Sequence, residues 1–174
     1  MIERAIWGLA YAFALVAGVS IVLMMLQTVT DVFMTNVFGR PIEGNLEISS
    51  IYHMVLVVFL PLALVELRHE NISADILVRL FPQRVQQIVY GLGQLVGAVF
   101  FGILAYQTWL DAVNAWRINE IMMGSTYVTI WPARFALPLG FVAVLLVSLL
   151  HAWKGFTDPS FDPVPPAPEI EEAV

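Results

Sequence analysis

Residues Glu66–Gln87, ELRHENISADILVRLFPQRVQQ, interrupt a very apolar chain. The stretch holds three arginines, one histidine and three acidic residues, and long apolar runs lie on both sides of it. It is therefore either a ligand-binding or catalytic insert, or the turn between two membrane spans. The composition of the flanking sequence distinguishes these two interpretations.

The flanking sequence is that of a membrane protein. The chain has 174 residues, of which 59% are hydrophobic and 13% are charged, and its mean hydropathy is +0.80. Its apolar residues form four blocks, at about 5–30, 46–66, 84–110 and 131–153. Each block reaches the roughly 20 residues that a helix needs to cross a bilayer, and none alternates as a barrel strand does. We predict an all-α membrane protein with four transmembrane helices in one domain, residues 1–156.

The opening stretch itself has the pattern of a short amphipathic helix. Its apolar residues can share one side of a helix: Ile72, Ile76, Leu77, Leu80 and Phe81. Asp75 and Arg79 would lie on the other side as an i,i+4 charge pair. Such a helix lies in the membrane interface, and Pro82 would end it and begin the third span. We therefore expect an interfacial helix between the second and third spans.

The basic residues predict the orientation. If the N-terminus is cytoplasmic, the inner side carries Arg4, Arg68, Arg79, Arg84 and Lys154, and the outer side carries Arg40, Arg117 and Arg134. Three of the inner residues lie in the opening stretch, and short cytoplasmic loops are characteristically basic. The tryptophans fall near predicted span ends, as in an interfacial belt. We expect both termini in the cytoplasm of a bacterium, with the chain in the inner membrane.

The ends of the chain and the absence of cysteine exclude several classes. The first block is too long and too evenly apolar for a cleaved signal peptide, so we expect it to remain as the first span. Residues 157–174 are acidic and rich in proline, which predicts a disordered cytoplasmic tail. Without cysteine the chain has no disulfides and no thiol redox chemistry. No segment is basic and aromatic enough to bind nucleic acid.

Groups that could carry chemistry inside the membrane are few. Intramembrane polar residues are expensive and usually functional, but here the charges fall near span ends, and Ser20, His53, Gln94 and Gln107 are the main exceptions. His53 and His151 lie at different predicted depths, which argues against a shared haem. Ser125 has no accompanying catalytic motif. We expect no cofactor, no metal and no enzymatic activity.

Small residues and prolines indicate how the helices pack. Ala10, Ala14 and Gly18 would give the first span a smooth face for another helix. Gly93 and Gly97 form a G-x-x-x-G pair, which fits either packing within the four-helix unit or docking of another subunit. Prolines inside the second and fourth spans, Pro61 and Pro138, should kink or open their helices.

Three segments resemble a known family. They are NVFGRPIEGNLEI at Asn36–Ile48, the opening stretch with Arg68, Asn71, Asp75 and Pro82, and WPARFALPLGF at Trp131–Phe141 with Pro138 and Gly140. Over about residues 5–153 the chain resembles the small membrane subunit, DctQ-type, of tripartite ATP-independent periplasmic (TRAP) transporters. Asn71 departs from the family pattern, where histidine is common.

The resemblance implies a scaffold with two protein partners. A large membrane subunit would carry the substrate and sodium sites, and a periplasmic solute-binding protein would deliver an organic acid-like solute to the outer face. Candidate docking residues for the binding protein are Asp31, Arg40, Glu43, Asp111, Arg117 and Glu120. Candidate contacts with the large subunit or with phospholipid are Gly93, Gly97, Trp131 and Arg134. The alternatives are solvated loop charges for the first set and, for the whole chain, a membrane anchor of a redox complex or an independent small transporter.

Overall fold

Four long helices dominate the structure. The computed structural model describes residues 2–68, 82–124 and 126–157. The helices that are long and apolar enough to cross a membrane are Glu3–Phe38, Asn45–Leu67, Gln83–Arg117 and Trp131–Thr157. The prediction of an all-α membrane protein with four spans is confirmed. The predicted interfacial helix, with Asn71 and Asp75, and the predicted tail beyond Thr157 lie outside the described residues.

Helix α1 (Ile2–Phe38) has 37 residues and is therefore about 55 Å long. Most of its surface is apolar and exposed, and four of its polar side chains are satisfied within the helix itself. Thr28, Thr30, Thr35 and Asn36 each donate to the carbonyl four residues earlier, at 2.7–2.8 Å. Because hydrocarbon offers no hydrogen bonds, this local bonding suits a helix that faces lipid.

The second span, Asn45–Leu67, is broken into pieces. It consists of α2 (Asn45–Ile48), a π-helical turn η1 (Ser49–His53), α3 (Met54–Phe59) and α4 (Leu62–Leu67). The break before α4 lies at Pro61, which has no N–H to continue the helix. In the fourth span the break at Phe135 separates α6 (Trp131–Arg134) from α7 (Ala136–Thr157), three residues before Pro138.

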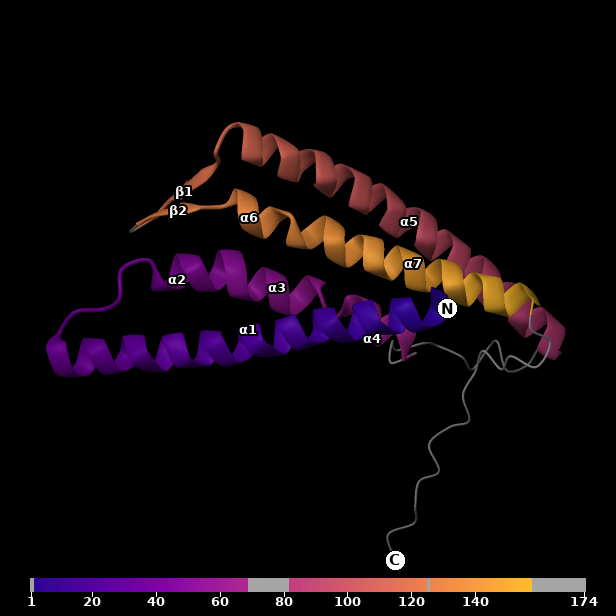
Figure 1. Ribbon diagram of the computed structural model, residues 1–174, viewed down its shortest axis with the longest axis horizontal. Helices are drawn as coiled ribbons and strands as arrows, with labels where there is room; N and C mark the ends of the chain where they lie inside the picture. The colour runs from indigo at the N-terminus through magenta and orange to yellow at the C-terminus, as the bar shows by residue number, and fades with distance from the viewer. Residues whose placement is uncertain (1, 69–81, 125, 158–174) are drawn as a thin grey trace, which may run out of the picture.

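The helices form two pairs. Helix α1 lies beside the second span, and α5 (Gln83–Arg117) lies beside α7 (Figure 1). The pairs converge where α1 begins and α7 ends, and they diverge toward the other end (Figure 1). There β1 (Ile121–Met123) and β2 (Tyr127–Thr129) form a short antiparallel hairpin. Sequence reasoning missed this hairpin, since three-residue strands carry no readable alternation.

Helix α7 is the central element. Its most apolar window is 56% buried, whereas the corresponding windows of the other three spans are 17% buried. The core joins Ala10 of α1, Ala63 and Leu67 of α4, and Val144 and Val147 of α7. The peripheral spans therefore keep most of their surface for lipid or for partner proteins.

The predicted packing face of α1 is only partly correct. Ala10, Ala17 and Ser20 are buried, at 1%, 3% and 3% exposure. Gly18, by contrast, is exposed, and a Cβ added there would meet no atom within 4 Å. The buried residues are spaced seven and three apart, so they follow the helix's own inward stripe instead of the four-residue ladder.

Gly140 lies where the broken second span crosses α7. A Cβ added to Gly140 would come within 2.9 Å of the carbonyl carbon of Phe59, and closer still to the carbonyl oxygen. The Phe59 carbonyl stands just before the break at Pro61. Only glycine allows two backbones to approach this closely, which explains the Pro138–Gly140 part of the family-like motif.

We predict that Gly140→Ala lowers the melting temperature of the purified chain in detergent, because the second span must retreat from α7. Overpacking of this kind typically costs about 1–3 kcal/mol. Gly97→Ala is the matched control, since its Cβ would meet no atom and alanine favours a helix over glycine by about 1 kcal/mol. Thermal unfolding followed by circular dichroism measures both, and equal melting temperatures would contradict the close crossing.

Candidate functional site

Five polar side chains form a continuous hydrogen-bonded chain between α1 and the second span. The Oγ of Ser20 lies 2.9 Å from Nδ1 of His53, and Nε2 of His53 lies 3.1 Å from Oε1 of Gln27. Nε2 of Gln27 donates to Oδ1 of Asn45 at 2.7 Å, and Nδ2 of Asn45 donates to Oδ2 of Asp31 at 2.9 Å. We call these five residues the polar network.

The hydrogen bonds of the polar network all have the same donor-to-acceptor direction, from Ser20 toward Asp31. The amide oxygen of Gln27 can only accept, so Nε2 of His53 carries the proton in this bond. In the neutral imidazole, Nδ1 of His53 is then an acceptor for the hydroxyl of Ser20. The amide of Gln27 then donates to Asn45, and the amide of Asn45 donates to the carboxylate of Asp31. Each group thereby polarises the next, which strengthens such chains in a low-dielectric setting.

Asp31 fixes the connection between α1 and the second span. Its Oδ1 accepts a hydrogen bond from the backbone N–H of Ile42 at 2.6 Å. Gly39 and Gly44 have φ of 65° and 78°, left-handed values that glycine adopts without strain. Arg40 and Glu43 lie on this connection and are exposed. Asp31 is therefore an internal acceptor that shapes the connection.

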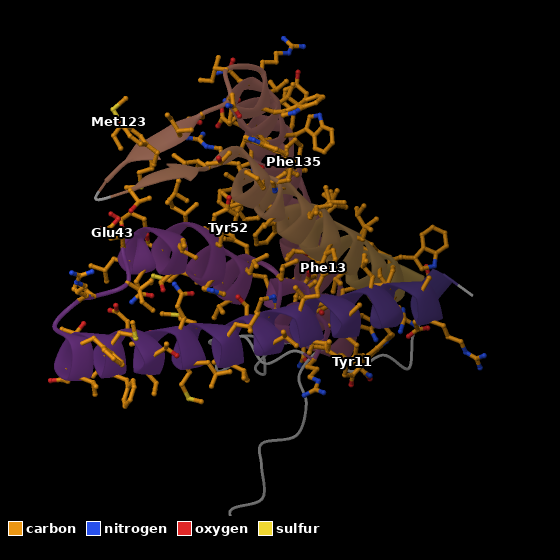
Figure 2. All side chains as sticks on the ribbon, turned by 60° about the vertical axis from the view of Figure 1, so that its left-hand side comes forward. Tyr11, Phe13, Glu43, Tyr52, Met123 and Phe135 are labelled. Atoms are coloured by element: carbon orange, nitrogen blue, oxygen red, sulfur yellow. The ribbon has the colours of Figure 1, made fainter. Side chains whose placement is uncertain are left out.

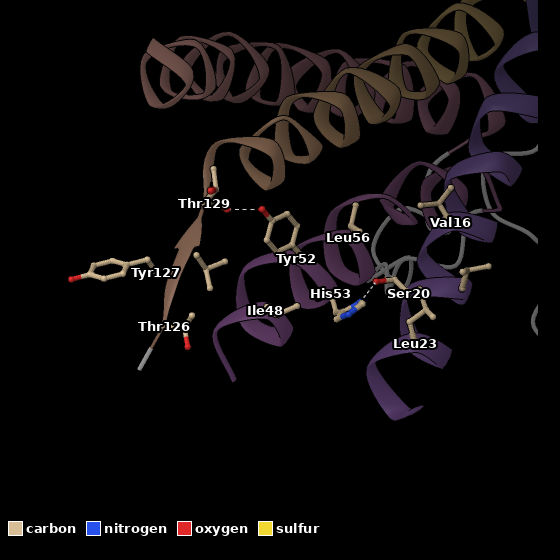
Figure 3. A pocket seen from close by; sticks show the side chains of 12 residues that line it. Val16, Ser20, Leu23, Ile48, Tyr52, His53, Leu56, Thr126, Tyr127 and Thr129 are labelled. Atoms are coloured by element: carbon tan, nitrogen blue, oxygen red, sulfur yellow. Dashed lines mark hydrogen bonds between the residues drawn. The ribbon is translucent and has the colours of Figure 1, made fainter. Parts of the chain in front are cut away.

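The π-helical turn η1 ties the second span to two neighbours at once. Two consecutive residues, Tyr52 and His53, point to different sides of it (Figure 3). His53 reaches Ser20 on α1, and the hydroxyl of Tyr52 donates to the carbonyl of Thr129 on β2 at 2.5 Å. π turns of this kind often mark functional positions. Here the turn holds α1 and the hairpin to one helix.

The hairpin also packs against the beginning of the second span. A Cβ added to Gly124 would overlap the carboxylate of Glu47, and a Cβ added to Gly44 would lie 3.3 Å from Cβ of Thr126. Glycines at both places let the hairpin lie close over α2. Figure 2 shows Glu43 and Met123, from the connection and from the hairpin, at the same end of the molecule.

A groove lies between α1 and the hairpin, over the second span. Its volume is about 680 Å³, and its lining is mostly apolar. Ile48, Tyr52 and Leu56 of the second span and residues 126–129 of the hairpin line it, together with Val16, Val19 and Leu23 of α1 (Figure 3). Ser20 and His53 of the polar network also line the groove.

The comparison with known families decides the identity of the chain. Residues 24–158 match the family of tripartite ATP-independent periplasmic transporters, DctQ component. The chain belongs to the DctQ family. It is therefore a small subunit of a TRAP transporter, a multi-pass protein of the inner membrane. No curated protein and no solved structure matches the chain in the corresponding comparisons.

Within this DctQ subunit, the predicted docking charges fall into two groups. Asp31 is engaged in the polar network, and Glu120 pairs with Arg134 at 2.7 Å. Arg40 and Glu43 on the connection, and Asp111 and Arg117 on the last two turns of α5, are exposed. The first group holds the fold, and the second remains accessible.

The other predicted residues lie at helix ends and on open surface. A Cβ added to Gly93 or Gly97 of α5 would meet no atom within 4 Å. The interpretation that this pair packs within the DctQ unit is therefore wrong. Trp131 begins α6, and its ring meets Phe135 edge to face at 6.4 Å. Pro82 is the N-cap residue of α5.

At the other end of the DctQ subunit, polar side chains join the helices. The guanidinium of Arg68 lies 5.6 Å from the ring centroid of Tyr11 and donates to its hydroxyl at 3.0 Å. Gln94 of α5 donates to the carboxylate of Glu66 on α4 at 2.8 Å. These contacts agree with the interpretation of an intramembrane glutamine as a link between helices.

Sequence reasoning missed two members of the polar network, Gln27 and Asn45. A signal was available on α1, because Ser20, Gln27 and Asp31 are spaced seven and four apart and so share one face of a helix. No comparable signal identified the partners on the second span, since the π turn changes the helical register there. Among the described residues, no group of three or more possible metal ligands comes together.

We predict that Gln27→Leu destabilises the DctQ subunit, because it leaves the N–H of His53 and the amide oxygen of Asn45 without partners. Removing one partner of a buried hydrogen bond costs about 1–3 kcal/mol. Thr28→Val is the control, since the Thr28 hydroxyl bonds only within its own helix. The readout is again the melting temperature in detergent; a Gln27→Leu value within error of the Thr28→Val value would mean that the network holds nothing together.

Proposed function

We propose that this DctQ subunit is a static scaffold for the large membrane subunit of a sodium-driven TRAP transporter. One observation carries the proposal. In the described part of the spans, the polar side chains Ser20, Gln27, His53 and Gln94 all hydrogen-bond within this chain. A site for an ion or a solute at membrane depth needs polar groups that are available to it. A scaffold needs none, and transport then belongs to the partner.

The hydrogen bonding of His53 also argues against the alternative function, a membrane anchor of a redox complex. A haem ligand needs an available ring nitrogen, but both ring nitrogens of His53 are hydrogen-bonded, to Ser20 and to Gln27. Freeing one would break the polar network. The scaffold function therefore accounts for His53 better than metal ligation does.

The proposal places the hairpin end on the periplasmic side. The opposite end carries four basic residues in the described part of the chain, Arg4, Arg68, Arg84 and Lys154, together with Trp7 and Trp153. An ion pair between Glu3 and Lys154 ties the beginning of α1 to the end of α7. The hairpin end carries Arg40, Arg117 and Arg134. This division supports cytoplasmic termini by the tendency of cytoplasmic segments to be basic.

On the periplasmic side, the solute-binding protein would dock on the accessible charges. Arg40, Glu43, Asp111 and Arg117 are exposed at this end and are the proposed contacts. The segment that carries Arg40 and Glu43 is held in shape by Asp31, so little ordering would be needed on docking. An organic acid-like solute would pass from the binding protein to the large subunit without touching this chain.

We predict that the chain alone, reconstituted into liposomes, shows no solute uptake. Uptake should appear when the large subunit and the solute-loaded binding protein are present together with a sodium gradient. Uptake of radiolabelled solute measures this. Transport by the single chain would overturn the scaffold proposal.

We predict that the double variant Arg40→Glu/Arg117→Glu lowers uptake several-fold while the two membrane subunits still co-purify. Charge complementarity mainly sets the association rate and orientation, so raising the concentration of binding protein should restore part of the activity. The control exchanges the Glu120–Arg134 pair as Glu120→Arg/Arg134→Glu, which keeps the ion pair and the net charge. Unchanged uptake in the first variant would remove these arginines from the docking surface.

A further inference from the structure

We propose that the beginning of α1 and the end of α4 form a binding site for an anionic phospholipid, with the phosphate over Trp7 between Arg4 and Arg68 and an acyl chain along α1. The inference goes beyond the scaffold function and does not depend on it, because it concerns the lipid around the subunit. It rests on a face of α1 that is cationic at one end and apolar beyond.

The cationic end of this face is built from two helices. The guanidinium of Arg68, at the end of α4, lies 5.6 Å from the ring centroid of Tyr11 and donates to its hydroxyl at 3.0 Å. Trp7 stacks on Tyr11 from one turn earlier, with 5.8 Å between the ring centroids. Arg4 precedes Trp7 by three residues, so it lies on the same face, about 10 Å from Tyr11 along the helix axis. The two arginines therefore lie on either side of Trp7 along this face.

The acids at these two helix ends are engaged by other helices. Glu3 pairs with Lys154 of α7, and Glu66 accepts a hydrogen bond from Gln94 of α5. Arg4 is exposed and makes no ion pair or hydrogen bond with any residue that the structure describes. A cation of this kind at a membrane surface attracts an anionic headgroup, and the indole and phenol groups beside it favour the same interfacial depth.

A shallow apolar groove continues from the aromatic pair along the same face. It has a volume of about 420 Å³ and is lined by Leu15, Gly18, Val19, Val22 and Leu23 of α1. Gly18 keeps it open, since a Cβ added there would meet no atom within 4 Å. The cationic end and the groove share one side of the helix, because the residues between them are spaced three and four apart. In order they are Arg4, Trp7, Tyr11, Leu15, Gly18 and Val22.

The dimensions of this face match a phospholipid in one leaflet. The distance from Tyr11 to Val22 is about 16 Å along α1, close to half of the roughly 30 Å hydrocarbon core. An acyl chain that starts at the level of Tyr11 would therefore end near the midplane. A free phosphate ion would use only the arginines, and a zwitterionic lipid would bring a cation of its own toward them. An anionic phospholipid uses both the arginines and the groove, and the membrane around the subunit supplies it.

Two exposed arginines at the same end of the molecule give a matched test. Arg4→Gln removes a charge from the proposed site, and Arg84→Gln removes one from α5; neither side chain has a partner among the described residues, so both variants should fold as the wild type does. Delipidated subunit in detergent is titrated with dioleoylphosphatidylglycerol, and bound lipid is counted by native mass spectrometry. We expect Arg4→Gln to weaken binding of the first lipid by about fivefold, as for the loss of one arginine near a membrane surface, and Arg84→Gln to leave it unchanged.

The acyl-chain part of the site has a matched pair of its own. Gly18→Leu fills the groove on α1, and Gly97→Leu adds the same side chain at an equally open position on α5. We expect only Gly18→Leu to weaken the binding of dioleoylphosphatidylglycerol, by several-fold. Melting temperatures of the variants show that each still folds.

Two further ligands distinguish a lipid from other sources of a phosphate. We expect dioleoylphosphatidylcholine to bind the wild type about tenfold more weakly than dioleoylphosphatidylglycerol, and inorganic phosphate not to displace the bound lipid. Equal affinity for the two lipids, or an equal loss in Arg4→Gln and Arg84→Gln, would overturn the site. Displacement by inorganic phosphate, or unchanged binding in Gly18→Leu, would refute a site that holds the headgroup and the acyl chain together.

Discussion

The backbones of the second span and α7 meet at Gly140, and the rest of the arrangement depends on this contact. The break at Pro61 leaves the Phe59 carbonyl at the crossing, and glycine on α7 provides the space for it. On another side α7 is close to α5, where a Cβ added to Gly155 would lie 3.4 Å from the ring of Tyr90 and 3.6 Å from the carbonyl oxygen of Gln87. With α7 in close contact with both neighbours, the two helix pairs can converge at one end and diverge at the other (Figure 1). The hairpin and the groove occupy the diverging end.

Hydrogen bonding within the chain explains how so apolar a structure carries polar residues at all. Hydrocarbon satisfies no donor or acceptor, and in this chain the polar side chains find hydrogen-bond partners in two ways. Thr28, Thr30, Thr35 and Asn36 bond to their own helix, which leaves that part of α1 suited to lipid. The polar network instead joins two helices through side chains, and it extends from Ser20 to the segment that carries Arg40 and Glu43. In the proposed scaffold, such cross-links would resist sliding of one helix along the other.

The sequence allows the four spans to be predicted because long apolar runs leave no soluble alternative, and the breaks follow from proline chemistry. Gly140 was recognisable as part of a motif, but its reason is a contact with Phe59 that no local pattern encodes. The polar network could be predicted only in part. Helical spacing groups Ser20, Gln27 and Asp31, whereas the alignment of Asn45 and His53 with them depends on a π turn and on which faces of two helices meet. For the same reason, the sequence could not decide whether Gly93 and Gly97 pack within the chain or face another subunit, and in the structure they lie open.

The polar network has a consequence for how the chain enters the membrane. Its members are divided between two helices, with Ser20, Gln27 and Asp31 on the first and Asn45 and His53 on the second. Either helix alone would bring unsatisfied amide, imidazole or carboxylate groups toward hydrocarbon, at a free-energy cost that pairing removes. The two helices are thus best inserted together, as one helix pair whose polar side chains are already hydrogen-bonded to each other. The short connection at residues 39–44, with its two left-handed glycines, favours this concerted step in biogenesis.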